Sequence, residues 1–345
     1  KRMVDWIEGL LGSDTGSELK LNQEQELVLR RIEGFLQSDA DDEVSKWLGM
    51  AASDISPKVA AVEVLSAAGK VPPDADRFLL TAGVQIQFSK PALDECAQLR
   101  AYVSEGSRFR EEREFIFSID DEDTEDIDDA LTVKETSGGF TVGIHIADVS
   151  HFVSKDDVLD LEAFRRKSSL YLPQKKIRMF PDRLSNDLSS LRAAEVRPTV
   201  MFEVDFGDEL SIRSNRIILS EVQVSNRLTY DEADEFLKSE GPNGIAVSLE
   251  LLDRVTRSLL QERIDAGALV IRRPELKIVL KDKEIELKVL EPDSPSRRIV
   301  SELMILGNRL AAEYARDNGL PIIYRAQNPP TGEIPQMSTY DPLLA

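Results

Sequence analysis

The chain has little sulfur, little imidazole and no long hydrophobic run. Its 345 residues include one cysteine, Cys96, and two histidines. A single thiol excludes an internal disulfide and a cysteine-rich zinc site, and we expect Cys96 to be a small, half-buried helix residue. No apolar run approaches the roughly 18 residues of a membrane span, and the N-terminus lacks the apolar core of a signal peptide. These absences favour a cytoplasmic protein with no membrane partner.

Positive charge is also scarce. The chain has 43 Lys and Arg against 63 Asp and Glu, a net charge of −20. This balance argues against non-specific affinity for nucleic acid, which normally comes from clustered cations that neutralise phosphates. Between Glu162 and Pro198, however, nine Lys or Arg stand against four acids. A metal-dependent phosphodiesterase would use such a basic patch to hold a phosphate backbone.

The acids are concentrated in one short segment. Eight of the ten residues at 120–129 are carboxylates, and apolar runs at 115–119 and 130–133 flank them. Like charges this close together raise one another's pKa unless a cation neutralises them, and a hard divalent cation with oxygen ligands is the obvious candidate. The segment therefore predicts a magnesium site.

Two other interpretations of the acidic segment compete with a magnesium site. Acidic runs are often solvated surface or disordered tail. Here Ile127 interrupts the acids and β-favouring residues bracket them, which favours a strand, a tight loop and a second strand. An EF-hand calcium loop needs Gly at its sixth position and Glu at its twelfth. Counting from Asp121 gives Asp126 and Thr132 there, which excludes that loop.

The length suits about two domains, and the pattern of apolar residues changes from helical to strand-like along the chain. Residues 1–110 are predicted to be mainly helical, with helical spacing at 23–32 and a helix that begins at Pro57. Residues 56–84 fit two architectures equally, a winged helix-turn-helix and a bundle of short helices that acts as an adaptor. A linker is expected near 100–112.

Residues 113–345 are predicted to form an α+β domain. A pair of glycines, Gly138 and Gly139, marks a hairpin bend. The expected strands and helices are strands at 116–119, 130–133, 140–146, 200–206 and 212–219, and helices at 248–265 and 297–318. In the last helix one apolar stripe is predicted, made of Ile299, Leu303, Leu306, Leu310 and Tyr314.

Five segments carry a resemblance to a known family. The first is Ser118-Ile119-Asp120, five residues, then Asp126-Ile127-Asp128-Asp129-Ala130, and four more follow at 145–153, 168–173, 184–191 and 298–305. Together they resemble, in order, the RNB catalytic domain of ribonuclease II and ribonuclease R, which are hydrolytic 3′-to-5′ exoribonucleases. The resemblance spans about residues 113–325 and implies a mixed α/β catalytic domain.

The resemblance implies a role for four of the acids. Asp120, Asp126, Asp128 and Asp129 match the catalytic aspartates with which the family holds magnesium at the scissile phosphate. Asp128 is expected to matter most for the chemistry, and Asp120 and Asp129 are expected to be the main metal ligands. The surplus acids, which are expected to be solvated or to lie outside the ligand set, are Asp121, Glu122, Asp123 and Glu125.

The resemblance also implies substrate contacts. Tyr171 matches an aromatic residue that stacks on the terminal base, an interaction that tolerates any base. Glu302 lies where the family contacts the terminal ribose, whose 2′-hydroxyl distinguishes RNA from DNA; a helix-surface glutamate is the alternative. Arg166 is expected to meet an RNA phosphate. The family's second clamping aromatic is replaced by Ile271, so the clamp departs from the family pattern.

Three further polar residues of the matched segments are expected to be structural. His145 is predicted to be a strand residue and His151 a turn or surface group, because the resemblance gives neither a catalytic role. Asp148 is expected to fix a loop rather than to bind metal.

The chain departs from the family at both ends. Family members usually begin with small β-barrel RNA-binding domains, whereas the first 110 residues here are predicted to be helical. Nothing after Ala345 supplies the family's phosphate-supporting arginine segment or its final OB-fold domain. We therefore expect a fragment, a processing product or one piece of a longer protein, with the remainder as a separate partner chain. Whether the chain is active by itself stays open.

The sequence favours a magnesium-dependent exoribonuclease that degrades single-stranded RNA from its 3′ end to nucleoside 5′-monophosphates. The alternative is a non-catalytic RNA-binding or scaffold protein on an RNB fold. A DNA-binding regulator led by a helix-turn-helix is disfavoured by the net charge of −20, and no stable DNA binding is expected.

Overall fold

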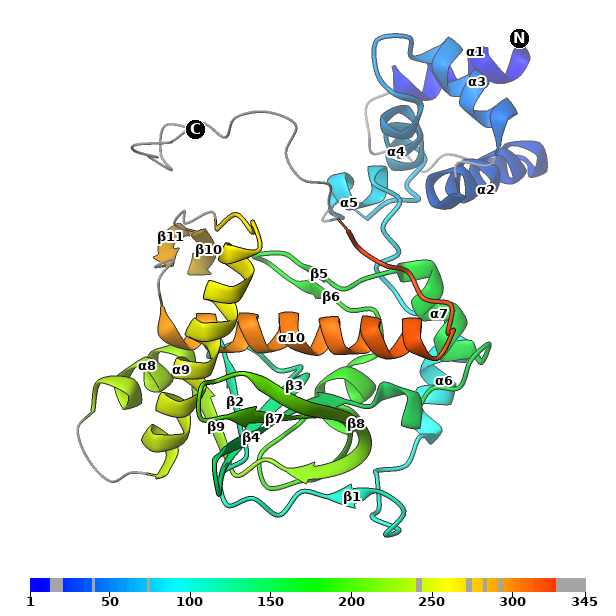
Figure 1. Ribbon diagram of the computed structural model, residues 1–345. Helices are drawn as coiled ribbons and strands as arrows, with labels where there is room; N and C mark the ends of the chain where they lie inside the picture. The colour runs from blue at the N-terminus through cyan, green and yellow to red at the C-terminus, as the bar shows by residue number, and fades with distance from the viewer. Residues whose placement is uncertain are drawn as a thin grey trace. The chain divides into compact units, whose positions relative to one another are not determined.

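The described part of the chain forms two compact units. The computed structural model describes residues 1–12, 21–38, 41–72, 75–239, 244–270, 275–281, 284–290 and 294–326. The first unit comprises residues 1–90 together with 162–168, and the second comprises the rest. The predicted mixed α/β class, preceded by a helical region, is confirmed (Figure 1).

The first unit is helical where it is described. Its helices are α1 (Arg2–Leu11), α2 (Gln23–Ser38), α3 (Asp42–Ala51), α4 (Pro57–Ala67) and α5 (Arg77–Thr81). Asp41, Ser56 and Asp76 cap the starts of α3, α4 and α5, because their side chains accept hydrogen bonds from backbone N–H groups of the first turn. The helical prediction is confirmed, while the helix-turn-helix reading of residues 56–84 stays a prediction.

The second unit begins before the predicted linker. Helix α6 (Lys90–Gln98) buries Ala92 and Cys96 in one apolar cluster with Leu159, Leu184 and Leu188. This packing groups the helix with the second unit, so the compact division falls at Lys90, while a linker near 100–112 stays a prediction. Cys96 lies in a helix as expected, but it is 2% exposed rather than half-buried.

A seven-stranded mixed sheet organises the second unit. Its strands are β1 (Phe109–Arg110), β2 (Phe117–Asp120), β3 (Asp129–Thr136), β4 (Gly139–Ala147), β7 (Val196–Gly207), β8 (Ile212–Gln223) and β9 (Asn226–Thr229). The spatial order is β1-β8-β7-β4-β3-β2-β9. The outermost pairs, β1 with β8 and β2 with β9, are parallel and the other pairs are antiparallel. All five predicted strands are present.

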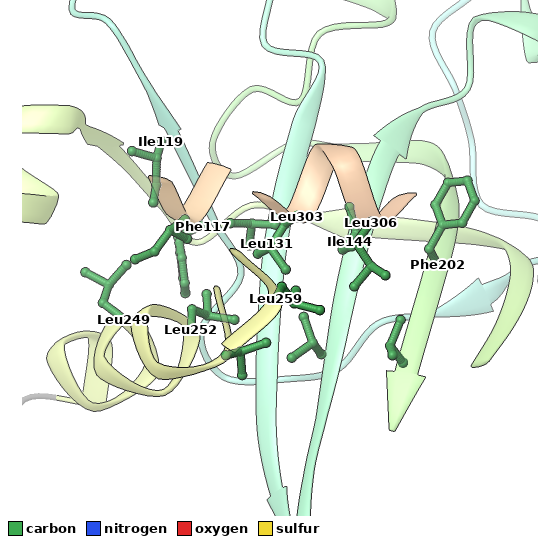
Figure 2. Packing of buried hydrophobic residues seen from close by; sticks show 14 of the residues in the cluster. Phe117, Ile119, Leu131, Ile144, Phe202, Leu249, Leu252, Leu259, Leu303 and Leu306 are labelled. Atoms are coloured by element: carbon green, nitrogen blue, oxygen red, sulfur yellow. The ribbon is translucent and has the colours of Figure 1, made fainter. Parts of the chain in front are cut away.

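Three helices supply one side of the core of this sheet: α8 (Tyr230–Lys238), α9 (Gly244–Asp265) and α10 (Pro295–Asp317) (Figure 1). Four members of the predicted stripe on α10 are at most 3% exposed, but the fifth, Tyr314, is 51% exposed. Figure 2 shows part of the cluster, with labels on Phe117, Ile119, Leu131, Ile144, Phe202, Leu249, Leu252, Leu259, Leu303 and Leu306.

A buried polar network lies among β3, β4 and β7. The Arg113 guanidinium donates to Glu111, Thr132 and Glu203. His145, which is fully buried on β4, is 3.1 Å from the Thr132 hydroxyl through Nε2. Burial lowers the pKa of His145 to about 3, so the ring is neutral at physiological pH. The structural role expected for His145 is confirmed.

Shorter elements complete the second unit. They are the 3₁₀ turn Val149–His151, α7 (Val158–Arg166, shared with the first unit), β5 (Leu170–Tyr171), β6 (Lys176–Ile177), the π-helical turn Arg183–Leu188, β10 (Glu275–Lys281) and β11 (Glu284–Leu290). Strands β5 and β6 form one hairpin, and β10 and β11 form another. None of the described helices has both the length and the apolar character that a membrane crossing needs.

Two aliphatic residues of α10 test this packing. Leu303 is fully buried against the sheet, whereas Ile305, two positions along, is 39% exposed. Leu303→Ala should lower the free energy of unfolding by about 2–5 kcal/mol, because it leaves a cavity in the core. The matched variant Ile305→Ala should cost clearly less. Urea denaturation measures both, and equal losses would contradict the described burial.

Candidate active site

The acidic segment connects two neighbouring strands of the sheet. Asp120 ends β2 and Asp129 begins β3. Strand β2 also pairs in parallel with β9, with Asp120 opposite Thr229. Thr229 is the N-cap of α8, which lies directly after β9. The acidic segment therefore leaves the sheet beside the end of β9 and the start of α8.

Ile127 anchors the loop between the two strands. Its side chain is 2% exposed and packs in a cluster with Ile116, Ala130 and Leu191. The Ser190 hydroxyl accepts a hydrogen bond from Ile127 N at 3.0 Å and donates to Glu125 O at 3.1 Å. The predicted order of strand, loop and strand is therefore confirmed, because an apolar side chain and a buried hydroxyl fix the centre of the acidic run.

Two acids near the start of the loop are paired with cations. Asp121 accepts from Arg297 at 2.7 Å and from Lys277 at 3.1 Å, and Lys277 also donates to Asp123 at 2.8 Å. Burial alone would raise the pKa of Asp121, but the two cations outweigh it and hold that pKa below its usual value. The hydrogen bond from Lys277 likewise lowers the pKa of Asp123.

Further cations hold the other end of the loop. Arg178 donates to Glu125 at 2.5 Å, and the Lys176 ammonium lies 3.7 Å from the same carboxylate. Arg227 of β9 donates to the backbone carbonyls of Glu122 and Thr124. We call Asp121, Asp123 and Glu125 the outer acids, because each is neutralised by a described Lys or Arg.

The four aspartates implied by the resemblance, which we call the inner acids, are in a different state. Asp120 Oδ2 and Asp129 Oδ2 are buried without a hydrogen-bond partner. Asp126 accepts a hydrogen bond from the Tyr171 hydroxyl at 2.5 Å. Asp128 is exposed to solvent. None of the four forms an ion pair within the described residues, so their charge is left uncompensated.

Three inner acids have raised pKa values. Burial and the charges of Asp120 and Asp128 raise the pKa of Asp129 to about 7. Burial is also the main cause for Asp120, whose pKa rises to about 6 although Arg227 opposes the shift. The surrounding protein partly removes the Asp128 carboxylate from water. This desolvation, together with the charge of Asp126, raises the pKa of Asp128 to about 6.

The donor chemistry of the inner acids fits a hard divalent cation. Carboxylate oxygens without a counter-charge are the ligands that Mg²⁺ prefers, and two of these oxygens are buried and unpartnered. As the side chains stand, no three His, Cys, Asp or Glu residues in the described ranges are placed to hold a metal ion together. The inner acids thus have the oxygen ligands and the negative charge that Mg²⁺ requires, but their side chains are not arranged as a preformed metal site.

A cavity of about 850 Å³ opens beside the loop. The acidic segment contributes Asp121, Asp123, Thr124 and Asp126 to its wall, and the other walls come from residues 171–176 of the β5–β6 hairpin and 276–280 of β10. Tyr171 is 61% exposed there. The structure therefore brings together the predicted stacking residue and the predicted metal ligand Asp126.

Two other expected substrate contacts are already engaged. Glu302 is 4% exposed, and both of its carboxylate oxygens accept hydrogen bonds from Arg263, at 2.7 and 3.0 Å. The Arg166 side chain is 3% exposed and belongs to the first unit, where it pairs with Glu162 and donates to the carbonyls of Gln85 and Gln87. Ile271 lies outside the described residues.

The predicted basic patch is mostly used inside the protein. Arg165 lies 3.7 Å from Glu162, and Arg183 donates to the carbonyls of Ala97 and Leu99. Arg192 and Arg197 both pair with Asp187 and Glu195. Most cations of the patch are therefore engaged by acids or carbonyl groups of the protein.

Sequence reasoning missed the cations that hold the acidic loop. Lys277 lies in an alternating strand pattern that carries no site signal, and Arg227 is a lone cation on an edge strand. Arg297 directly precedes the matched segment 298–305, which was the one available hint. Asp148, expected to fix a loop, does so through Arg108 and Ser150, and His151 lies in a turn against Tyr102 and Phe152.

The chain belongs to the RNB domain family, whose profile matches residues 108–337. Within the family it is similar to ribonucleases. It is 30% identical over 277 residues to Ribonuclease R 2 of Lactococcus lactis, covering 76% of this chain and 42% of that protein. It is 37% identical over 223 residues to an uncharacterized ribonuclease of Synechocystis, covering 64% of this chain and 32% of that protein. The chain thus spans less than half the length of these relatives.

Solved structures agree with the fold. RNase R of Mycoplasma genitalium in complex with double-stranded RNA superposes with a TM-score of 0.65 at 25% identity, covering 71% of this chain and 45% of that one. The same enzyme in complex with ribose-methylated single-stranded RNA gives a TM-score of 0.64 at 25% identity, covering 70% and 39%.

The pKa of Asp129 predicts how stability depends on pH in the absence of metal. A folded pKa of about 7 exceeds the unfolded value of about 3.9, so the folded protein binds the extra proton between these values. The contribution of this group to stability therefore falls as the pH rises from about 4 to 7. Asp129→Asn should raise the melting temperature in EDTA at pH 8, by at least ~2 °C, and much less at pH 5.

The control for this experiment is Asp208→Asn, which removes an exposed charge in the turn between β7 and β8. That variant corrects for the general effect of lowering the net negative charge. A melting temperature of Asp129→Asn at pH 8 that does not exceed the temperatures of both wild type and control would contradict the raised pKa.

Proposed function

We propose that the protein is a magnesium-dependent 3′-to-5′ exoribonuclease that hydrolyses single-stranded RNA to nucleoside 5′-monophosphates. The observation that carries this proposal is the division of one acidic segment into neutralised outer acids and uncompensated inner acids, the latter beside an exposed tyrosine. Its relatives are named as ribonucleases. Since the chain covers less than half of their length, the activity of the whole protein is part of the proposal.

Magnesium would be held by Asp120, Asp126, Asp128 and Asp129. When bound, it polarises a phosphoryl oxygen and lowers the pKa of the attacking water. The outer acids and their cations keep the loop in position, so the rearrangement that brings the inner carboxylates around a cation would be confined to their side chains. Asp128 is exposed to solvent, so its carboxylate can reach both a bound cation and the attacking water.

Tyr171 would hold the RNA end. Its ring is exposed in the cavity wall while its hydroxyl is fixed by Asp126. Stacking on any base is the kind of contact that a sequence-independent exonuclease needs. Reading of the terminal ribose is not assigned to Glu302, because Arg263 already occupies its carboxylate.

A second candidate is a non-catalytic RNA-binding protein on the same fold. The observation in its favour is that no group of three potential ligands in the described residues is arranged to hold a metal. The two candidates differ in one respect that can be measured, because both bind RNA but only the first shortens it.

Asp128→Asn tests the proposed chemistry. With 5′-labelled single-stranded RNA and Mg²⁺, the wild type should shorten the RNA progressively from its 3′ end. The variant should be slower by about 10²-fold or more, because it loses a proton acceptor and a charged ligand. Addition of EDTA should stop the wild type. Thin-layer chromatography of 3′-terminally labelled substrate should identify nucleoside 5′-monophosphate.

The matched control is Glu122→Gln, which removes an exposed acid of the same loop that belongs to neither the inner nor the outer acids. It should retain wild-type activity. Cleavage by Asp128→Asn at the wild-type rate would refute the assigned chemistry. RNA binding without any shortening by the wild type would favour the second candidate. DNA of the same sequence, incubated in parallel, measures the preference for ribose.

Two substitutions at Tyr171 separate its ring from its hydroxyl. Tyr171→Phe keeps the stacking surface and removes the hydrogen bond to Asp126. Tyr171→Ala removes both and should weaken RNA binding in EDTA by about 1–3 kcal/mol. Tyr171→Phe should bind RNA within about twofold of wild type, since the π-face is unchanged. Fluorescence anisotropy measures both affinities, and equal losses would show that the ring does not stack.

A further inference from the structure

Most cations of the stretch 162–198 have acidic or carbonyl partners. Within the described residues, seven of its nine Lys and Arg make ion pairs or hydrogen bonds through their side chains. The other two are Lys167 and Lys175, whose ammonium groups contact no acid or carbonyl group of the described residues. Only Lys175 lines the cavity beside the inner acids.

A tight hairpin turn fixes Lys175 near the predicted stacking residue. Leu172 and Lys175 exchange backbone hydrogen bonds, N to O, at 3.0 and 3.3 Å, which closes the turn between β5 and β6. Tyr171 pairs directly with Lys176 in the next rung of the hairpin. The backbone spacing between Tyr171 and Lys175 is therefore set by a two-residue turn rather than by long flexible segments.

The other cavity cations are already neutralised. Lys176 donates to the carbonyl of Asp123 and lies near Glu125, and Lys277 bridges Asp121 and Asp123. An RNA strand that enters this cavity meets a wall with three aspartates, of which Asp126 forms no ion pair with a described residue and repels its phosphates. A favourable contact with an RNA phosphate therefore needs a Lys or Arg side chain that is not already ion-paired with a carboxylate.

We infer that Lys175 binds a backbone phosphate of the RNA strand whose terminal base stacks on Tyr171. This inference rests on the proposed function and assigns it a specific electrostatic contact. The ammonium acts as a point charge on a flexible stem, so it follows the backbone without reading the base. Lys175 is thus a substrate-binding residue, and the hairpin carries both the stacking and the phosphate contact.

The test measures RNA binding by the full chain in EDTA, so that cleavage does not interfere. The probe is a fluorescein-labelled single-stranded oligoadenylate, titrated at several salt concentrations. Lys175→Met should weaken binding about five- to tenfold at low salt, and the slope of log affinity against log salt should fall by about 0.7, the value for one phosphate on a single strand. Lys175→Arg keeps the charge and should restore both quantities.

The matched control is Lys167→Met, which removes the other lysine that lacks a described partner and does not line the cavity. It should leave the salt slope unchanged. Melting temperatures establish that each variant is folded, and Lys175→Gln replaces Lys175→Met if the latter does not fold.

The outcomes separate the inference from the function on which it rests. Wild-type affinity and slope in Lys175→Met, with RNA still bound and shortened by the wild type, would overturn the inference alone. An equal fall in slope for Lys167→Met would also overturn it, because the effect would then be general. Failure of the wild type to bind the oligoadenylate would overturn both the inference and the proposed function.

Discussion

Mutual repulsion among the carboxylates of residues 120–129 is the constraint on which the second unit depends. The fold neutralises some of these charges and leaves others without a partner. The cations that do so come from separate parts of the chain: the β5–β6 hairpin and the segment after it, β10, and the first turn of α10. Strands β6 and β10 pair within their own hairpins, whereas α10 packs in the core, so Arg297 ties the loop to the core directly. The remaining repulsion is concentrated on the inner acids, where a divalent cation would relieve it.

The sequence predicted the features that depend on local patterning. Alternating apolar residues located the strands, and the stripe on α10 was right for the four residues that reach the sheet. Ile127 was the decisive residue for the loop, because one apolar side chain within an acidic run is difficult to reconcile with a solvated tail. The separation of inner from surplus acids came from the spacing of the family motif, and the structure gives it a physical basis in ion pairing.

What the sequence did not predict were the partners of charged groups. Nothing in the sequence near Glu302 indicates that Arg263, on a different helix, occupies its carboxylate. Arg166 was expected to meet an RNA phosphate, yet its partners include Gln85 and Gln87, about 80 residues earlier. A local excess of charge says little about which charges are free, because that depends on contacts that only the fold creates. The absence of a described partner for Lys175 emerged in the same way.

The ion pairs of Asp121 also bear on the order in which the site is assembled during synthesis. Lys277 and Arg297 follow Asp121 by 156 and 176 residues. Ribosomes add residues from the N-terminus at about 5–20 per second, so Asp121 is made about 8 to 35 seconds before these two cations. A nascent chain that ends before α10 therefore lacks Arg297, one of the two cations that pair with Asp121. Completion of that helix therefore supplies the last of the described cations that hold the acidic loop.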